Sequence, residues 1–140
     1  MFYKPLLYPL IIQVALTFLV WFRMYQTRLA EIRQKKIDPL EFRRRVDAQR
    51  LLHNTAAADN FANQFEMPVL FYVAVVLSLA LMLHDTVIVT LSWMFVGLRV
   101  IHSAIHISYN KATHRFVVYL MSSITLLALW ARLAWYFMSR

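Results

Sequence analysis

The sequence contains no cysteine and only one glycine, and each absence excludes a class of functional site. Without cysteine, the chain has no disulfide, no zinc–thiolate centre and no cysteine nucleophile. With Gly97 as its single glycine, it has neither a Walker loop nor a glycine-rich dinucleotide-binding motif, because both need several glycines next to phosphate groups. Acidic residues are also scarce, seven against fifteen lysines and arginines. The chain is therefore a basic protein that lacks several common kinds of catalytic centre.

Apolar side chains, by contrast, are abundant and indicate that lipid is the solvent. Hydrophobic residues make up 61% of the 140 residues, and the mean hydropathy is +0.53. A chain this short forms one domain, and its surface-to-volume ratio is too high for it to bury so much apolar surface in water. Most of the net charge of +8 lies between apolar runs, as the positive-inside rule describes for membrane proteins. We therefore predict a membrane protein that does not bind nucleic acid.

Four apolar runs have the length of membrane-spanning helices. A run of about 17–23 residues, at about 1.5 Å per residue, crosses a hydrocarbon core of about 30 Å, and a helix satisfies its own backbone groups there. The third run is long enough only if its helix continues past His102 to about Tyr109. We therefore predict an all-α membrane protein, a four-transmembrane-helix bundle that forms one domain over residues 1–140. The predicted helices cover about residues 5–25, 48–83, 86–109 and 114–138, with a link over about 26–47.

The distribution of basic residues predicts the orientation in the membrane. Segment 23–66 carries nine lysines and arginines, whereas the link 84–86 carries none. The third link adds Lys111 and Arg115 on the same side as the first. Because basic loops stay in the cytoplasm, we expect both termini on the opposite side, which is the periplasm if the protein lies in a bacterial inner membrane.

Polar residues precede the second apolar run at helical spacing. Asn60, Asn63 and Glu66 are three residues apart, so they share one face of a helix just before Pro68. A carboxylate beside an apolar run is costly unless it faces protein or water. Glu66 therefore either ends the hydrophobic span at the interface or faces a partner inside the bundle.

The third run contains an arginine and two histidines on one stripe. Arg99, His102 and His106 are separated by three and four residues, and Arg99 has apolar neighbours on both sides. Arg99 either extends to the headgroups or forms a buried ion pair with Glu66, and we favour the ion pair. The two histidines are too few ligands for a metal site, so we expect no metal and neutral, hydrogen-bonding rings.

The fourth helix begins with a further polar pair, Arg115 and Tyr119, one turn apart. Three helices thus present asparagine, glutamate, arginine, histidine and tyrosine at a similar membrane depth. Guanidinium groups bind carboxylates in bidentate fashion, and an arginine near a thiol favours the reactive thiolate. These residues suit a polar anionic ligand whose reaction partner is apolar and arrives through the lipid.

The order and spacing of these motifs resemble those of the membrane-associated proteins in eicosanoid and glutathione metabolism, the MAPEG family. One motif is Asn63-Gln64-Phe65-Glu66-Met67-Pro68, which is similar to the family's Asn-x-x-Glu followed by proline. The other is Arg99-Val100-Ile101-His102 followed by Arg115-Phe116-Val117-Val118-Tyr119, which resembles the corresponding segment of microsomal prostaglandin E synthase. The resemblance covers most of the chain.

The resemblance implies a homotrimer with glutathione as co-substrate, bound between subunits near the cytoplasmic face. It places Asn63 and Glu66 at the polar ends of glutathione, with Arg99 bracing the carboxylate of Glu66. Arg115 is implied as the catalytic residue that stabilises the thiolate. The residues implied to line the peptide are His102, His106 and Tyr119.

Several positions depart from the pattern of the eicosanoid branch. Asp59 and Ala62 occupy positions where that branch has arginine, His106 replaces a tyrosine, and Phe116 replaces a serine. Pro68 also follows the glutamate more closely than in eukaryotic members. These departures argue against prostaglandin or leukotriene synthesis.

Three functions are compatible with the sequence to different degrees. The resemblance implies a glutathione-dependent transferase or peroxidase that acts on lipophilic electrophiles in the membrane. The alternative is a non-catalytic member of the same fold that binds another anionic amphiphile. A small transporter has the least support, because the first helix offers only Gln13 where four-helix exporters need a carboxylate.

Overall fold

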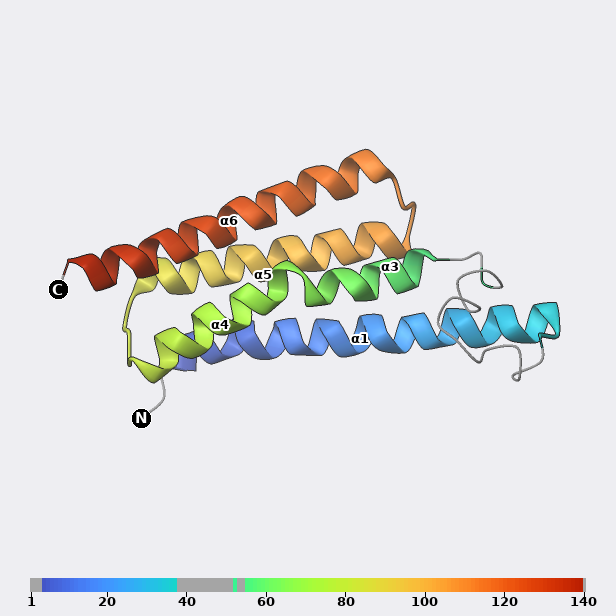
Figure 1. The fold of residues 1–140 in the computed structure, drawn as a ribbon, viewed down its shortest axis with the longest axis horizontal. Helices are drawn as coiled ribbons and strands as arrows, with labels where there is room; N and C mark the ends of the chain where they lie inside the picture. The colour runs from blue at the N-terminus through green and yellow to red at the C-terminus, as the bar shows by residue number, and fades with distance from the viewer. Residues whose placement is uncertain (1–3, 38–51, 53–54, 140) are drawn as a thin grey trace.

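The computed structural model describes residues 4–37, 52 and 55–139, and these residues form a lengthwise bundle of helices (Figure 1). Both ends of the chain lie at one end of the bundle, and the turn between the last two helices lies at the other (Figure 1). The elements are α1 (Lys4–Lys35), α3 (Ala56–Ala62), the short 3-10 helix η2 (Asn63–Phe65), α4 (Met67–Ala80), α5 (Thr86–Ile107) and α6 (Ala112–Met138).

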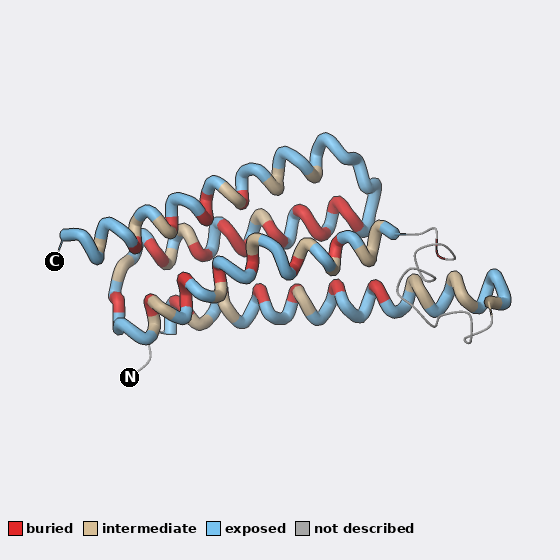
Figure 2. Tube along the Cα trace, in the orientation of Figure 1, coloured by how far each residue is buried: buried red, intermediate tan, exposed pale blue. Residues whose placement is uncertain are grey.

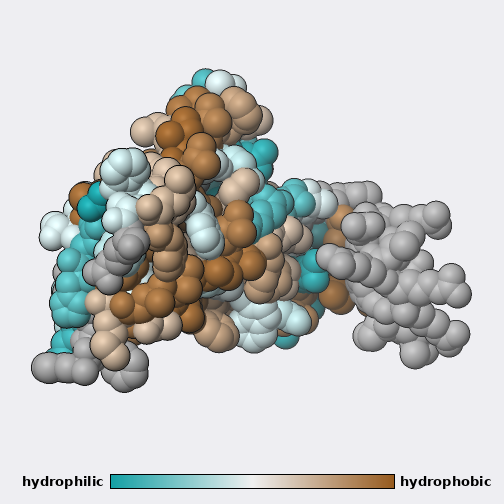
Figure 3. All heavy atoms as spheres, turned by 60° about the vertical axis from the view of Figure 1, so that its left-hand side comes forward, coloured by the Kyte–Doolittle hydropathy of each residue, from teal (hydrophilic) through white to brown (hydrophobic). Residues whose placement is uncertain are grey.

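Four spans of this bundle are long and apolar enough to cross a membrane: α1, α3 through α4 together, α5 and α6. Large hydrophobic side chains are exposed on all four spans, and brown side chains cover the middle of the face seen in Figure 3, with teal side chains at its edges. Figure 2 shows that buried positions concentrate on α5 and on the inward faces of the other helices. In the described residues, the structure thus confirms the predicted four-helix membrane bundle.

The helix α1 buries a single stripe and exposes the rest of its apolar surface. Exposed residues such as Ile11, Phe18 and Leu19 are 60–67% accessible, which is stable only where lipid covers them. The buried positions recur every three or four residues, as one face of a helix requires. They are Leu6, Pro9, Gln13, Leu16, Val20 and Met24.

The core at the end opposite the 108–111 turn is apolar and well packed. Phe71 of α4 stacks on Phe95 of α5 with ring centroids 4.7 Å apart. Leu126, Leu129 and Leu133 of α6 are buried in the same cluster. This apolar packing fixes α5 against α4 and α6, and therefore sets the positions of the polar residues farther along α5.

The first helix is longer than predicted, since α1 continues to Lys35 rather than ending near residue 25. Residues 26–35 are mostly good helix formers, and an ion pair of 2.6 Å joins Glu31 to Lys35 one turn apart. Hydropathy marks the end of the membrane span but carries no information about where the helix itself ends. The predicted start of the second helix at residue 48 lies outside the described residues.

The second span is not one continuous helix. The α-helix α3 passes into η2, and Glu66 then adopts φ −95° and ψ −107° before α4 begins at Met67. Pro68 lies in the first turn of α4, where its missing N–H costs nothing, but a continuous helix would have lost a hydrogen bond there. The proline therefore bends the chain at the residues that the sequence placed in a ligand site.

Asp85 holds the opposite end of the bundle together. Its Oδ1 accepts hydrogen bonds from the backbone N–H groups of Val87 and Ile88, at 2.8 and 3.2 Å, and so caps α5. Its Oδ2 accepts from Nε of Arg132 at 2.9 Å and lies 2.8 Å from Nη2 of the same side chain. One carboxylate thus ties the start of α5 to α6.

Replacing Asp85 should separate these two contributions. We expect Asp85→Ala to lower the free energy of unfolding by about 1–2 kcal/mol, since it removes the cap and the ion pair. Asp85→Asn keeps a capping oxygen and should cost about half as much. Thermal unfolding in detergent measures both, and equal losses from the two variants would contradict this account of the residue.

Candidate functional site

The residues named from the sequence gather at the end of the bundle that holds the α5–α6 turn. Asn63 and Glu66 come from the bend between α3 and α4, three more residues come from α5, and two come from α6. An open groove of about 220 Å³ lies among them. It is lined by Asn63, His102, His106, Ala112, Arg115, Phe116 and Tyr119. Glu66 and Arg99 do not line the groove, but each bonds to a residue that does.

Arg99 is fully buried at this depth of the bundle. Its Nη2 donates a hydrogen bond of 2.6 Å to the backbone carbonyl of Asn63, and its guanidinium carbon lies 5.8 Å from the ring centre of Tyr119. Its Nε and Nη1 have no hydrogen-bond partner among the described residues. A buried guanidinium with two unpaired nitrogen donors retains strong capacity to attract an acceptor.

The predicted ion pair between Arg99 and Glu66 is not formed. Among the described residues, the only ion pairs within 4.0 Å are Lys35–Glu31 and Arg132–Asp85. Glu66 is exposed and instead accepts a hydrogen bond of 3.1 Å from the hydroxyl of Tyr119. The bend at Asn63–Glu66 presents a backbone carbonyl to Arg99, and pairing with a carbonyl avoids desolvating the carboxylate.

Arg115 and His106 form the centre of the groove. Nη1 of Arg115 lies 3.1 and 3.0 Å from the two ring nitrogens of His106, and Nε2 of that ring lies 3.3 Å from Nδ2 of Asn63. A guanidinium only donates, so the histidine ring accepts from it and is neutral. Arg115 has no carboxylate within 4.0 Å in the described part of the chain. Its charge is therefore directed at the groove without being neutralised by an acidic neighbour.

His102 contacts both Arg115 and His106. Its Nδ1 lies 3.2 Å from the backbone carbonyl of Arg115, which can only accept, so Nδ1 carries the hydrogen. Its ring lies edge-on to His106, with the two ring centroids 5.0 Å apart. No group of three potential metal ligands gathers among the residues that the structure describes.

A polar cluster beside the groove was not found from the sequence. Gln64, between the two ligand candidates Asn63 and Glu66, is fully buried and bonds to Gln13 of α1 and Ser103 of α5. Asn60 joins this cluster instead of sharing the groove with Asn63. The available signal was Gln13, a polar residue inside an apolar run, which is rarely tolerated without a partner.

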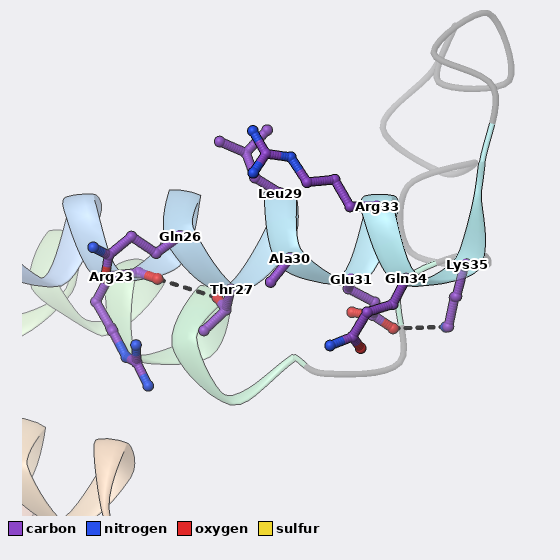
Figure 4. Close-up of a pocket in the computed structure, with 9 residues that line it drawn as sticks. All are labelled: Arg23, Gln26, Thr27, Leu29, Ala30, Glu31, Arg33, Gln34 and Lys35. Carbon is purple, nitrogen blue, oxygen red and sulfur yellow. Dashed lines mark hydrogen bonds and ion pairs between the residues drawn. The ribbon is translucent and has the colours of Figure 1, made fainter.

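A larger hollow, of about 980 Å³, lies along the end of α1 (Figure 4). The lining residues that the structure describes all belong to one helix, between Arg23 and Lys35, and their side chains spread along it without converging (Figure 4). A ligand site needs polar groups that converge from several elements. Of these two hollows, as the described residues line them, the groove at Arg115 meets that condition.

Comparison with known proteins gives one match. The family model described as "MAPEG family" matches residues 6–135, which is nearly the whole chain. No curated protein and no solved structure matches. The match confirms the resemblance found in the Asn63–Pro68 and Arg99–Tyr119 motifs, and it agrees with the four helical spans. The chain belongs to the MAPEG family.

Proposed function

We propose that the protein is a glutathione-dependent transferase or peroxidase that acts on lipophilic electrophiles in the membrane. Membership of the family supports a role in glutathione or eicosanoid metabolism at a membrane. The observation that carries the narrower proposal is the guanidinium of Arg115, which faces an open groove without a carboxylate partner among the described residues. A thiolate placed there gains a charge-assisted hydrogen bond that a thiol does not.

The surrounding residues suit the remainder of glutathione. Asn63 and the exposed carboxylate of Glu66 are available to its polar ends, while His102, His106 and Tyr119 form the walls. Arg99 acts indirectly, because it holds the backbone of Asn63. Phe116, which is 64% exposed beside Arg115, offers an apolar approach for a lipophilic substrate from the lipid.

The chemistry requires only that the thiolate be formed and directed. In conjugation, the sulfur forms a bond to an electrophilic carbon, the leaving group departs with its bonding electrons, and the thiol proton passes to water. In peroxide reduction, two glutathione molecules are oxidised to the disulfide while the hydroperoxide is reduced to an alcohol and water. In both reactions Arg115 stabilises the sulfur anion before it attacks.

The assembly that we propose is a homotrimer with the site between subunits. The groove of about 220 Å³ in one chain is smaller than the roughly 300–1,000 Å³ of usual ligand pockets, so a neighbouring subunit would complete it. We also propose that the groove faces the cytoplasm and both termini the periplasm of a bacterial inner membrane, because the basic end of α1, with Arg33 and Lys35, and the turn that holds Lys111 lie at the groove end (Figure 1).

A second candidate is a non-catalytic protein that binds another anionic amphiphile. The charge of Arg115 at the groove favours an anion without specifying glutathione, and Asp59 and Ala62 replace arginines of the eicosanoid branch. Lipid extraction and mass spectrometry of the purified protein would identify such a ligand. A transporter gains no support, because Gln13 is fully buried and bonded to Gln64.

The proposed function is tested by conjugation of glutathione with an aromatic halide in detergent. We expect product formation that depends on both enzyme and glutathione and that saturates with glutathione. S-Methylglutathione, which lacks the thiol, should inhibit competitively without reacting. No conjugation and no peroxide reduction at millimolar glutathione, together with a co-purified amphiphile, would favour the second candidate instead.

A further inference from the structure

A buried series of hydrogen bonds joins four helical elements beside the groove and has no part in the chemistry proposed above. Nε2 of Gln13 donates to Oε1 of Gln64 at 3.1 Å, and Nε2 of Gln64 donates to Oγ of Ser103 at 3.3 Å. Oγ of Ser103 in turn donates to Oδ1 of Asn60 at 3.1 Å. All four side chains are at most 2% exposed. These hydrogen bonds therefore join α1, η2, α5 and α3 inside the apolar bundle.

This network of hydrogen bonds is a poor means of stabilising the fold. Oε1 of Gln13 and Nδ2 of Asn60 are buried without a hydrogen-bond partner among the described residues. Each such group costs more than its neighbours' hydrogen bonds return, and a partly satisfied network is less stable than an apolar core. Hydrogen bonds, unlike apolar contacts, are directional, so the network fixes the positions of the residues that it joins.

The network fixes the position of the bend in the second span. Gln64 lies within η2, between Asn63 and Glu66, and is bonded on one side to α1 and on the other to α5. The carbonyl of Asn63, one residue away, is held by Arg99 of α5. Figure 1 shows the chain bending at this point between α3 and α4. Asn63 and Gln64, two adjacent residues of the 3-10 helix at the bend, are thus fixed to α5, which contributes His102 and His106 to the groove.

We propose that Gln64 is a positioning residue that, through Gln13 and Ser103, fixes Asn63 and Glu66 at the groove so that they meet an anionic peptide ligand. The inference rests on the proposed glutathione site for its binding readout. Its structural part, the anchoring of the bend, does not depend on glutathione. The first helix, which contributes no residue to the groove, thereby influences ligand affinity.

The test compares Gln13→Leu, Gln64→Leu and the double variant in detergent, with Ser92→Ala as the matched control. Ser92 is buried on α5 and bonds only to its own helix, through the carbonyl of Ile88. Each single variant should lower the melting temperature, because it leaves a buried amide unpaired. The double variant should recover most of that loss, because two leucines pack where two amides bonded.

Glutathione affinity should not recover with stability. We expect the Kd for glutathione, measured by calorimetry, to rise about tenfold in both single variants and to stay raised in the double variant, while Ser92→Ala keeps the wild-type Kd. Amide hydrogen exchange at residues 63–67 should also be about tenfold faster in all three glutamine variants.

Two results would overturn the inference. One is a double variant whose melting temperature and Kd return together, which is what a purely structural network predicts. The other is unchanged amide exchange at residues 63–67 in the double variant. If the wild-type protein does not bind glutathione at all, the proposed function fails, and the exchange measurement alone decides whether Gln64 anchors the bend.

Discussion

Arg115→Ala is expected to reduce glutathione-dependent turnover by about 10²–10³-fold, because it removes the donor that we propose to stabilise charge on the reacting sulfur. The helix should survive the change, since Arg115 lies near the start of α6 and its backbone carbonyl still bonds to His102. Glutathione affinity should fall less than turnover, because the other groove residues remain. The measurement is kcat with an aromatic halide, with Kd determined separately by calorimetry.

Two controls separate loss of charge from loss of structure. Arg115→Lys keeps a positive charge but loses the planar guanidinium, so we expect an intermediate rate. The rate of Arg115→Ala should recover partly above about pH 8.5, where a free cysteine thiol ionises without help. If Arg115→Ala retained wild-type kcat at neutral pH, the proposed catalytic role of this residue would be wrong.

Arg99→Met is expected to lose function while retaining stability, which is the opposite of an ordinary buried substitution. The change removes a charged hydrogen bond to the carbonyl of Asn63, worth about 1.5–3 kcal/mol. It also removes two buried nitrogen donors without partners among the described residues, each of which costs about 1–3 kcal/mol. The terms nearly cancel, so the free energy of unfolding should stay within about 1 kcal/mol of wild type or increase.

The functional loss should nevertheless be large. Without Arg99, the carbonyl of Asn63 is no longer held against α5, and we expect the Kd for glutathione to rise about tenfold or more. Arg132→Met is the matched control, because Arg132 is ion-paired with Asp85 at the other end of the bundle. It should lose stability and keep glutathione affinity. A fall of several kcal/mol in the stability of Arg99→Met would show that Arg99 is primarily structural.

The four-helix architecture could be predicted from the sequence because hydropathy alone determines it. Runs of apolar residues long enough to span lipid have only one stable backbone form in an open chain. The ends of the helices were harder to predict. Residues 26–35 lie beyond the apolar run, yet α1 continues through them to Lys35. The turn at Pro68 was marked in the sequence, but whether a proline bends a helix or begins one depends on its neighbours in space.

The spacing of the residues predicts which of them line the groove, but it does not predict their hydrogen bonds. Helical periodicity brings His102 and His106 to one face, and the motif order placed Arg115 beside them. The predicted partner of Arg99, Glu66, was wrong, because a sequence does not show which backbone carbonyls are free to accept a hydrogen bond. Gln64 was missed for a similar reason, since its role follows from a contact with Gln13, 51 residues away.

The central claim is that the groove at Arg115 binds glutathione with its sulfur ionised, and an ultraviolet difference spectrum tests it most directly. Glutathione added to the wild-type protein in detergent at neutral pH should produce the absorbance of a thiolate, in proportion to bound ligand. S-Methylglutathione should produce none, and Arg115→Ala should bind glutathione with little or no such signal. Glutathione that bound without a thiolate signal, or with the same signal in Arg115→Ala, would contradict the account.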